Sequence, residues 1–157
     1  MRLSTTTIEP LRKQRRVPLA PARTFELFTD SMATWWPLQT HSCGEEDAID
    51  IRFEGRIGGR IVEITKDGTE YDWADVIAWD PPHRFVLAWH PNPEPVAATI
   101  IDVRFSALDG GGTQIDLVHS SWEELGDELG RATREGYDTG WDHVLGAFDR
   151  SHAPSGT

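Results

Sequence analysis

The residue with the clearest capacity for chemistry is His119, which alternates with Ile115 and Leu117 along one face of an expected strand. If that face is turned toward the core, the imidazole lies inside the protein, close to the start of the following helix. A buried histidine of this kind is most often a hydrogen-bonded part of the core. The functional alternative is a polar anchor for a ligand at one end of a cavity.

Asp75 is a second candidate, and its role depends on which face of the segment 71–79 is buried. One face carries large side chains and the other small ones: Tyr71, Trp73, Ile77 and Trp79 on the face of Asp75, against Ala74, Val76 and Ala78. With the aromatic face inward, Asp75 becomes a buried carboxylate whose raised pKa suits an acid or a base. With the alanine face inward, Asp75 is solvated. The sequence leaves both arrangements open.

The polar segment 41–47 brings His41 and Cys43 together with three acidic residues. These are metal-binding residue types, yet their spacing matches no common metal site, so a solvated loop is the favoured interpretation. Cys43 would need an activating base to act as a nucleophile, and nothing in the spacing shows that His41 contacts it. The motifs of nucleotide-binding loops, zinc proteases and serine hydrolases are missing. We therefore predict no metal, no cofactor and no catalytic residue.

The last helix-like segment, residues 131–150, combines an apolar stripe with a flank of small residues. The stripe consists of five side chains at helical spacing: Tyr137, Trp141, Val144, Leu145 and Phe148. Gly136 and Gly140 lie along its edge, where each glycine costs roughly 1 kcal/mol relative to alanine. Either another backbone packs very close to this flank, or space is left there for a ligand. The large rings of the stripe are also able to fill such a space themselves.

Strands and tight turns are expected over most of the remaining chain. Apolar alternation between glycine and proline turns predicts strands at 8–19, 49–53, 60–65, 71–79, 84–90, 97–107 and 113–119. Pro21 suits the start of a short helix, and residues 32–36 form a second one. The segment 121–124 has the capping-box pattern that opens a helical stretch to Leu129, which Gly130 bends or interrupts before the final helix.

These elements define a fold. Consecutive strands joined by tight turns form an antiparallel meander, and one face of it has to be covered by the only long helix. We therefore predict an α+β fold: a curved antiparallel sheet of about seven strands wrapped around a long C-terminal helix, with two short helices after the first strand. We expect a single domain over residues 1–157, with a disordered tail at 151–157.

The composition predicts a cytoplasmic protein that binds neither nucleic acids nor membranes. Its formal net charge is −11, so phosphate backbones and anionic lipid surfaces repel it. The chain has no apolar run of membrane-spanning length, and its N-terminus lacks the apolar core of a signal peptide. Residues 12–16 form the one basic cluster. We interpret it as protection of a sheet edge, with a docking patch for an acidic partner as the alternative.

A series of short motifs follows one another along nearly the whole chain. They are VPLAPA at 17–22, FELFTD at 25–30, WWP at 35–37, GGR at 58–60 with Glu63, WDPPHR at 79–84 with Trp89, Gly112-Thr113, LVHSSW at 117–122, and Gly140-Trp141 with Leu145. In this order they resemble the START-like or SRPBCC superfamily, which has the helix-grip fold. The branch that they resemble contains the proteins similar to the activator of the heat-shock-protein-90 ATPase.

The resemblance implies an apolar cavity between the sheet and the terminal helix, where many relatives bind lipids, hormones, polyketides or aromatic compounds. Through the name of the branch it also implies a chaperone as a partner. Fold similarity alone does not determine the function. The cavity, however, agrees with the glycines beside the last helix and with the seven tryptophans of the chain.

We therefore expect the protein to bind a small, largely apolar or aromatic molecule between the sheet and the C-terminal helix. The expected lining residues are Trp35, Trp36, Trp73, Trp89, His119, Tyr137, Trp141 and Phe148. One alternative is a co-chaperone-like protein-interaction domain. Another is an enzyme of cyclase or hydrolase type that uses His119 and Asp75 in the same cavity. Tryptophans on the outer face of the sheet would favour a homodimer.

Overall fold

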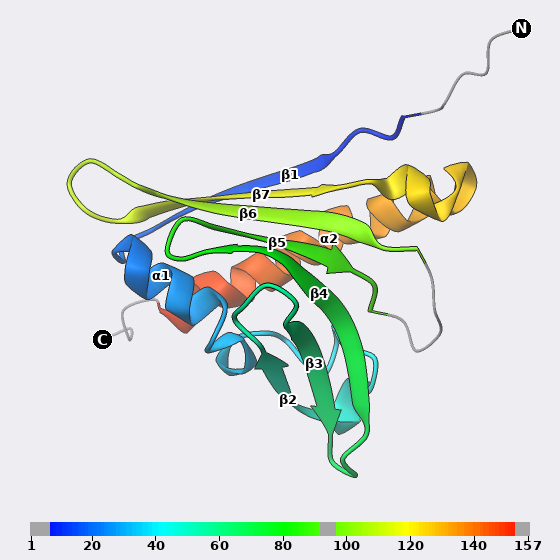
Figure 1. The fold of residues 1–157 in the computed structure, drawn as a ribbon. Coiled ribbons are helices and arrows are strands. Elements are labelled where there is room, and N and C mark those ends of the chain that lie inside the picture. Colours follow the sequence, from blue (N-terminus) through cyan, green and yellow to red (C-terminus); the bar gives the residue numbers. More distant parts are fainter. Residues whose placement is uncertain (1–6, 92–96, 153–157) are drawn as a thin grey trace, which may run out of the picture.

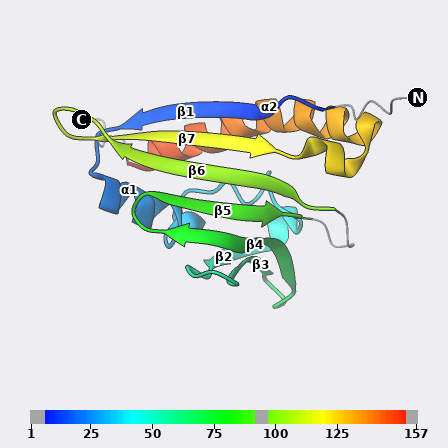
Figure 2. The same ribbon diagram turned by 45° about the horizontal axis from the view of Figure 1, so that its top comes forward.

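The computed structural model describes residues 7–91 and 97–152. Its centre is a seven-stranded antiparallel sheet in the order β1-β7-β6-β5-β4-β3-β2, which curls around one long helix (Figures 1 and 2). The strands are β1 Leu11–Val17, β2 Ala48–Phe53, β3 Arg60–Thr65, β4 Glu70–Asp80, β5 Arg84–Trp89, β6 Thr99–Ala107 and β7 Thr113–Ser120. The predicted α+β architecture is confirmed, strand by strand.

The start of the first helix and the long C-terminal helix also agree with the sequence predictions. Helix α1, Pro21–Phe28, begins at a proline, whose fixed φ suits the first helical turn. A short 3-10 helix, η1 Met32–Thr34, follows it, and another, η2 Glu45–Asp47, precedes β2. Helix α2, Asp127–Ser151, lies across the concave face of the sheet (Figure 1). It includes the first residue of the expected tail, whereas 153–157 lie outside the described residues.

The helical stretch predicted for 121–129 is confirmed only in part, and the predicted capping box and the break at Gly130 are wrong. Ser121 has a φ of 68° and makes no capping hydrogen bond through its side chain. A helix N-cap needs extended backbone angles, so a residue in the left-handed region cannot form the capping box. The chain instead makes a 3-10 turn, η3 Trp122–Leu125, and α2 then runs without interruption through Gly130.

The apolar stripe of α2 is buried against the sheet as predicted. Trp141, Val144, Leu145 and Phe148 are all buried. The ring of Phe148 lies 5.2 Å from that of Phe28 in α1, at an edge-to-face angle of 63°. Burial of each such side chain contributes about 1.5–3 kcal/mol, which explains why a helix with four glycines stays in place.

Two basic residues of β1 form ion pairs with acidic residues on the solvent-facing side of α2. Lys13 Nζ lies 3.0 Å from an Asp142 oxygen, and Arg15 Nε lies 3.1 Å from Asp149. Arg12 and Arg16, which flank this segment, alternate with Lys13 and Arg15 along the strand and are exposed. Since β1 is the end strand of the described sheet and pairs with β7, the cluster does lie on an edge strand. Part of its charge is therefore neutralised by α2 rather than offered to a partner.

Neither face of strand β4 is buried over the whole strand, because the buried face changes along it. Its pairing shifts by one residue at Trp73 against β3, and again at Ile77 against β5. A β-bulge of this kind places two residues opposite one and exchanges the faces beyond it. As a result, Trp73 and the adjacent Ala74 are both buried, at 1% and 0% exposure. The two arrangements considered from the sequence each hold for only part of the strand.

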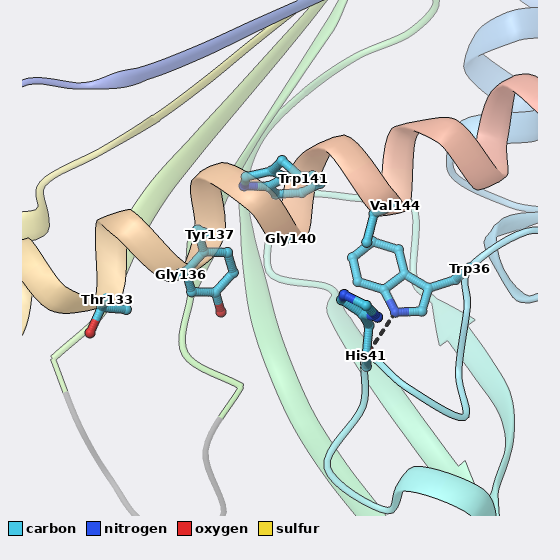
Figure 3. Close-up of a pocket in the computed structure, with 8 residues that line it drawn as sticks. All are labelled: Trp36, His41, Thr133, Gly136, Tyr137, Gly140, Trp141 and Val144. Atoms are coloured by element: carbon cyan, nitrogen blue, oxygen red, sulfur yellow. Dashed lines mark hydrogen bonds between the residues drawn. The ribbon is translucent and has the colours of Figure 1, made fainter.

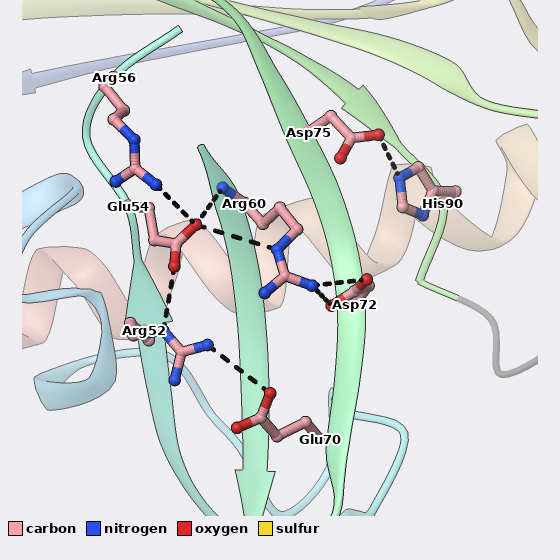
Figure 4. A network of polar contacts seen from close by, with 8 residues as sticks. All are labelled: Arg52, Glu54, Arg56, Arg60, Glu70, Asp72, Asp75 and His90. Carbon is pink, nitrogen blue, oxygen red and sulfur yellow. Dashed lines mark hydrogen bonds and ion pairs between the residues drawn. The ribbon is translucent and has the colours of Figure 1, made fainter. Parts of the chain in front are cut away.

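Asp75 therefore lies on the outer face of the sheet. Its carboxylate is exposed and lies 3.0 Å from His90 Nε2 (Figure 4). The same face carries further ion pairs between β2, β3 and β4, such as Arg60 with Asp72 at 3.0 Å. The arrangement in which Asp75 is a buried acid or base is thus excluded. Exposed pairs of this type contribute at most about 1 kcal/mol each, so they mainly keep the outer face polar.

The N-terminal part of α2 packs very closely on η3. A Cβ atom at Gly130 would lie 2.3 Å from the Trp122 carbonyl oxygen and 2.8 Å from Ile8 Cδ1. The end of the Ile8 side chain can move aside, but the Trp122 carbonyl oxygen belongs to the backbone and leaves no room for a side chain. Gly130 is consequently the glycine of α2 that a neighbouring backbone requires.

This difference between glycines is testable by paired substitutions in one helix. We expect Gly130→Ala to lower the free energy of unfolding by about 1–3 kcal/mol, because the added methyl group forces the backbones apart. Gly136→Ala, whose Cβ meets nothing within 4 Å, should raise it by up to about 1 kcal/mol through helix propensity. Urea unfolding followed by tryptophan fluorescence measures both. Equal effects of the two substitutions would contradict the packing described above.

Candidate functional site

The small flank of α2 faces open space. Neither Gly136 nor Gly140 has any atom within 4 Å of the position that a Cβ would take. Of the two explanations for glycine in this helix, close backbone contact therefore applies to Gly130 and open space to Gly136 and Gly140. The rings of the stripe do not fill that space.

The open space is a groove of about 350 Å³ along α2, here called the helix groove. It is lined by Trp36, His41, Thr133, Gly136, Tyr137, Gly140, Trp141 and Val144. Figure 3 shows Trp36 and His41, from the loop after η1, standing opposite the helix near Val144. The glycines leave the helix side of the groove flat, so the aromatic rings determine the shape of the groove.

A second hollow continues from the helix groove toward the sheet and is here called the loop chamber. It has a volume of about 430 Å³ and shares Trp36, His41 and Tyr137 with the helix groove. Its other lining residues are Ser42, Cys43, Tyr71, Trp73, Trp89 and Pro91. Two hollows with three lining residues in common are neighbours, and together they form the candidate site, with a helix side and a sheet side.

The loop over the chamber is held by Glu63, a fully buried residue of β3. One carboxylate oxygen accepts the backbone N–H of Cys43 at 2.7 Å, and the other accepts that of Gly44 at 2.6 Å. The indole N–H of Trp73 donates to the first oxygen at 2.9 Å. A buried carboxylate requires such donors, and these attach the loop to β3 and β4.

Glu63 was not among the predicted site residues, although a signal for it exists. It alternates with Ile61 and Thr65 on the inward face of β3. A carboxylate on an apolar strand face is unusual enough to suggest a specific partner. What the alternation does not reveal is that the partner is a loop twenty residues earlier in the chain.

The polar edges of the tryptophans are used inside the protein. Most indole N–H groups donate to an internal acceptor: those of Trp35, Trp36, Trp73, Trp89, Trp122 and Trp141. For example, the Trp36 N–H donates to the His41 carbonyl oxygen at 2.7 Å. The rings that line the two hollows therefore present carbon surface to them. This favours an apolar or aromatic occupant.

His119 is a hydrogen-bonded residue of the core. Its Nδ1 accepts the indole N–H of Trp141 at 3.0 Å, so the proton of the neutral ring is on Nε2, which lies 2.7 Å from Thr99 Oγ1. Burial lowers the pKa of His119 to about 3. Both ring nitrogens are occupied, and the ring lies behind Trp141. It positions that tryptophan and is not exposed to the groove.

Cys43 and His41 do not form a nucleophile and base. Burial raises the pKa of the Cys43 thiol to about 11, and the nearby Glu63 carboxylate adds to the rise. The thiol lies 3.2 Å from the Pro91 carbonyl oxygen. The His41 ring instead stacks on His143 of α2, at 4.6 Å between centroids and 10° between planes. Within residues 7–91 and 97–152, no three histidine, cysteine or acidic side chains gather as a metal site.

Tyr137 lines both hollows and carries a hydroxyl group. Its hydroxyl oxygen accepts the indole N–H of Trp89 at 2.8 Å. Burial raises the pKa of Tyr137, which more than offsets the opposite effect of that hydrogen bond. The side chain is therefore a neutral phenol at physiological pH.

Five of the eight predicted lining residues line the helix groove or the loop chamber: Trp36, Trp73, Trp89, Tyr137 and Trp141. The other three do not line either hollow. Trp35 and Phe148 pack on each other with 4.9 Å between ring centroids, and His119 lies behind Trp141. Sequence reasoning missed the loop residues His41 and Ser42 as lining, because nothing local shows that the loop folds over the helix.

The sheet wrapped around a single helix, with a hollow between them, places the protein in the SRPBCC class of helix-grip folds. Residues 18–152 match the family described as "Activator of Hsp90 ATPase homolog 1-like protein". The chain belongs to this family. No curated protein matches it in sequence. No helix among the described residues is long and apolar enough to cross a lipid bilayer.

Several solved structures have a similar fold. The chain is similar to Txn09, an anthrahydroquino-gamma-pyrone synthase solved in complex with SUM, at 30% identity and a TM-score of 0.56 over 98% of this chain and 92% of that one. It is also similar to the Aha1 dimer of Colwellia psychrerythraea, at 18% identity and a TM-score of 0.68 over 95% and 100%. Protein MLL2253 of Mesorhizobium loti has a TM-score of 0.67 at 14% identity, again over 95% and 100%. The last two establish the fold alone.

The dependence of the loop on Glu63 is open to a direct test. Glu63→Gln should lower the free energy of unfolding by about 2–4 kcal/mol, since an amide nitrogen would face N–H donors inside the protein. Hydrogen exchange at the amides of Cys43 and Gly44 should accelerate at the same time. Glu70→Gln, at an exposed position of β4, is the control and should change neither quantity appreciably. Unchanged exchange in Glu63→Gln would show that the loop is held by something else.

The buried His119 predicts a pH dependence of stability. Its folded-state pKa of about 3 is below the ordinary value of 6.5, so its contribution is complete above pH 6.5 and is lost as the pH falls toward 3. Between pH 7 and pH 5 this loss is about 2 kcal/mol. His119→Gln keeps a donor and an acceptor but does not titrate, so its free energy of unfolding should fall by about 2 kcal/mol less over that interval.

His83 is exposed and provides the control for this measurement. The His83→Gln variant should show the same pH dependence as the unmodified protein in urea unfolding at each pH. Parallel curves for His119→Gln and the unmodified protein would contradict the assignment of a neutral, buried His119.

Proposed function

We propose that the protein binds a small, largely apolar or aromatic molecule in the helix groove and the loop chamber. The observation that carries the proposal is the open space beside Gly136 and Gly140, walled by the rings of Trp36, Tyr137 and Trp141. Hollows lined mainly by apolar and aromatic side chains, with a few polar groups among them, are the usual sites of small, largely apolar ligands. The combined size of the two hollows suits a molecule of a few fused rings.

The similarity to Txn09 supports the aromatic alternative. That protein is an anthrahydroquino-gamma-pyrone synthase, and the two chains share 30% of their residues over nearly their whole lengths. The flat side of the helix groove, made by two glycines, fits a planar ring system better than a branched aliphatic chain. We therefore infer that the occupant is planar and aromatic.

The alternatives from the sequence receive less support. The enzyme hypothesis required two ionisable groups that converge in the cavity, but Asp75 lies on the outer face and His119 has both nitrogens occupied. The co-chaperone hypothesis relied on the basic cluster of β1, where Lys13 and Arg15 pair with α2. The family name and the dimer of the Colwellia protein keep a chaperone partner and a homodimer as further proposals.

A substitution that fills the groove without disturbing the core tests the proposal. In Gly140→Leu, the new side chain should occupy the middle of the helix groove and weaken binding of the neutral fluorescent probe N-phenyl-1-naphthylamine at least about 10-fold. The helix should not lose stability, because leucine has a higher helix propensity than glycine. Fluorescence titration measures the affinity, and urea unfolding checks the fold.

Thr139→Leu is the matched control, because it adds a leucine at the adjacent, exposed position of the same helix, outside the groove. It should bind the probe as the unmodified protein does. If the probe does not bind the unmodified protein, or if both leucine variants bind it equally well, the proposed site is wrong. Native mass spectrometry of the purified protein would then identify any small molecule that it carries.

A further inference from the structure

The hydroxyl group of Tyr137 combines two properties that bear on the identity of the occupant. It belongs to a side chain that lines three hollows: the helix groove, the loop chamber and a smaller hollow of about 130 Å³. Its oxygen already accepts the indole N–H of Trp89 at 2.8 Å. The donor position of Trp89 is fixed, because its ring packs against Trp36 and Trp73.

The accepted hydrogen bond determines what Tyr137 has left to offer. A phenol has one proton to donate. Trp89 cannot accept it, because an indole nitrogen is a donor only. Among residues 7–91 and 97–152, no acceptor lies within hydrogen-bonding distance of that proton. Tyr137 is half-buried, and a molecule that displaces water from its hydroxyl group has to supply an acceptor for this proton. The site thus presents an O–H donor, oriented by Trp89, beside the faces of several aromatic rings.

The surroundings also determine the charge of a suitable acceptor. The carboxylate of Glu63 lies just behind the loop chamber, where it helps to keep the Cys43 thiol protonated. A second anion in the chamber would face this carboxylate in a protein whose net charge is already −11. A neutral oxygen, such as a ketone or quinone carbonyl, avoids this repulsion and accepts the proton equally well.

We propose that the occupant is a neutral aromatic ketone or quinone whose carbonyl oxygen accepts the hydroxyl proton of Tyr137 while its rings lie in the helix groove. Tyr137 is thus the specificity-determining residue of the site, and Trp89 orients its hydroxyl group. The inference rests on the proposed function, because it names the class of molecule that the same site selects. It adds a polar requirement to what is otherwise an apolar hollow.

Two probes that differ only in the carbonyl group test this inference. Fluoren-9-one and fluorene have the same flat tricyclic frame, and the ketone alone has an acceptor for Tyr137. We expect the unmodified protein to bind fluoren-9-one about 3- to 10-fold more tightly than fluorene, because the hydrocarbon leaves the O–H group without a partner. Fluorene-9-carboxylate, an anion of similar size, should bind more weakly than fluoren-9-one. Equilibrium dialysis of the full chain gives all three affinities.

Substitution of the two tyrosines of the site assigns the donor. Tyr137→Phe should abolish the preference for the ketone while leaving the affinity for fluorene unchanged within about 2-fold, because the ring remains and only the hydroxyl group is removed. Tyr71→Phe removes the other phenol of the loop chamber and should retain the preference. Urea unfolding of both variants confirms that they are folded.

The outcomes separate this inference from the proposed function. If fluorene and fluoren-9-one bind the unmodified protein equally, or if Tyr71→Phe rather than Tyr137→Phe removes the preference, the inference is overturned and the apolar site remains. Tighter binding of the carboxylate would also overturn it. If neither tricyclic compound binds, the proposed function fails and the inference fails with it.

Discussion

The candidate site depends on one buried interaction, the set of hydrogen bonds accepted by the carboxylate of Glu63. Removing a carboxylate from water is costly unless donors replace the water, and here the donors are the backbone N–H groups of Cys43 and Gly44 and the indole of Trp73. The loop over the chamber therefore cannot leave without exposing an unsatisfied charge. Because this loop forms one wall of the helix groove, the shape of the groove follows from a charge on the sheet.

The tryptophans explain how one chain builds a dense core and an apolar hollow from the same residue type. Trp35 and Trp122 fill space in the core, whereas Trp36 and Trp89 form walls. In each of them the indole N–H is bonded inside the protein. The hollow therefore receives indole faces whose N–H groups are already bonded, and one of these N–H groups, that of Trp89, orients the hydroxyl of Tyr137.

The chemistry suggested by individual residues is largely neutralised by their surroundings. His119 serves as an acceptor for Trp141 and stays uncharged, and Cys43 stays a thiol. The bulges of β4 turn Asp75 outward to the polar face shown in Figure 4. The same bulges allow the sheet to bend around α2, since an extra residue on one strand increases the local twist. Curvature of the sheet and removal of that carboxylate from the cavity thus have a common cause.

The sequence by itself determined the strands, the stripe of α2 and the presence of unusual glycines at 136 and 140, because these depend on local periodicity and on the intrinsic cost of glycine in a helix. It also indicated five of the residues that line the site. Only the tertiary structure decided that these glycines face open space, that Asp75 points outward and that a loop held by Glu63 closes the groove. A one-residue bulge reverses the faces of a strand, and a buried carboxylate is satisfied by whichever distant backbone reaches it. Neither effect leaves a periodic trace in the sequence.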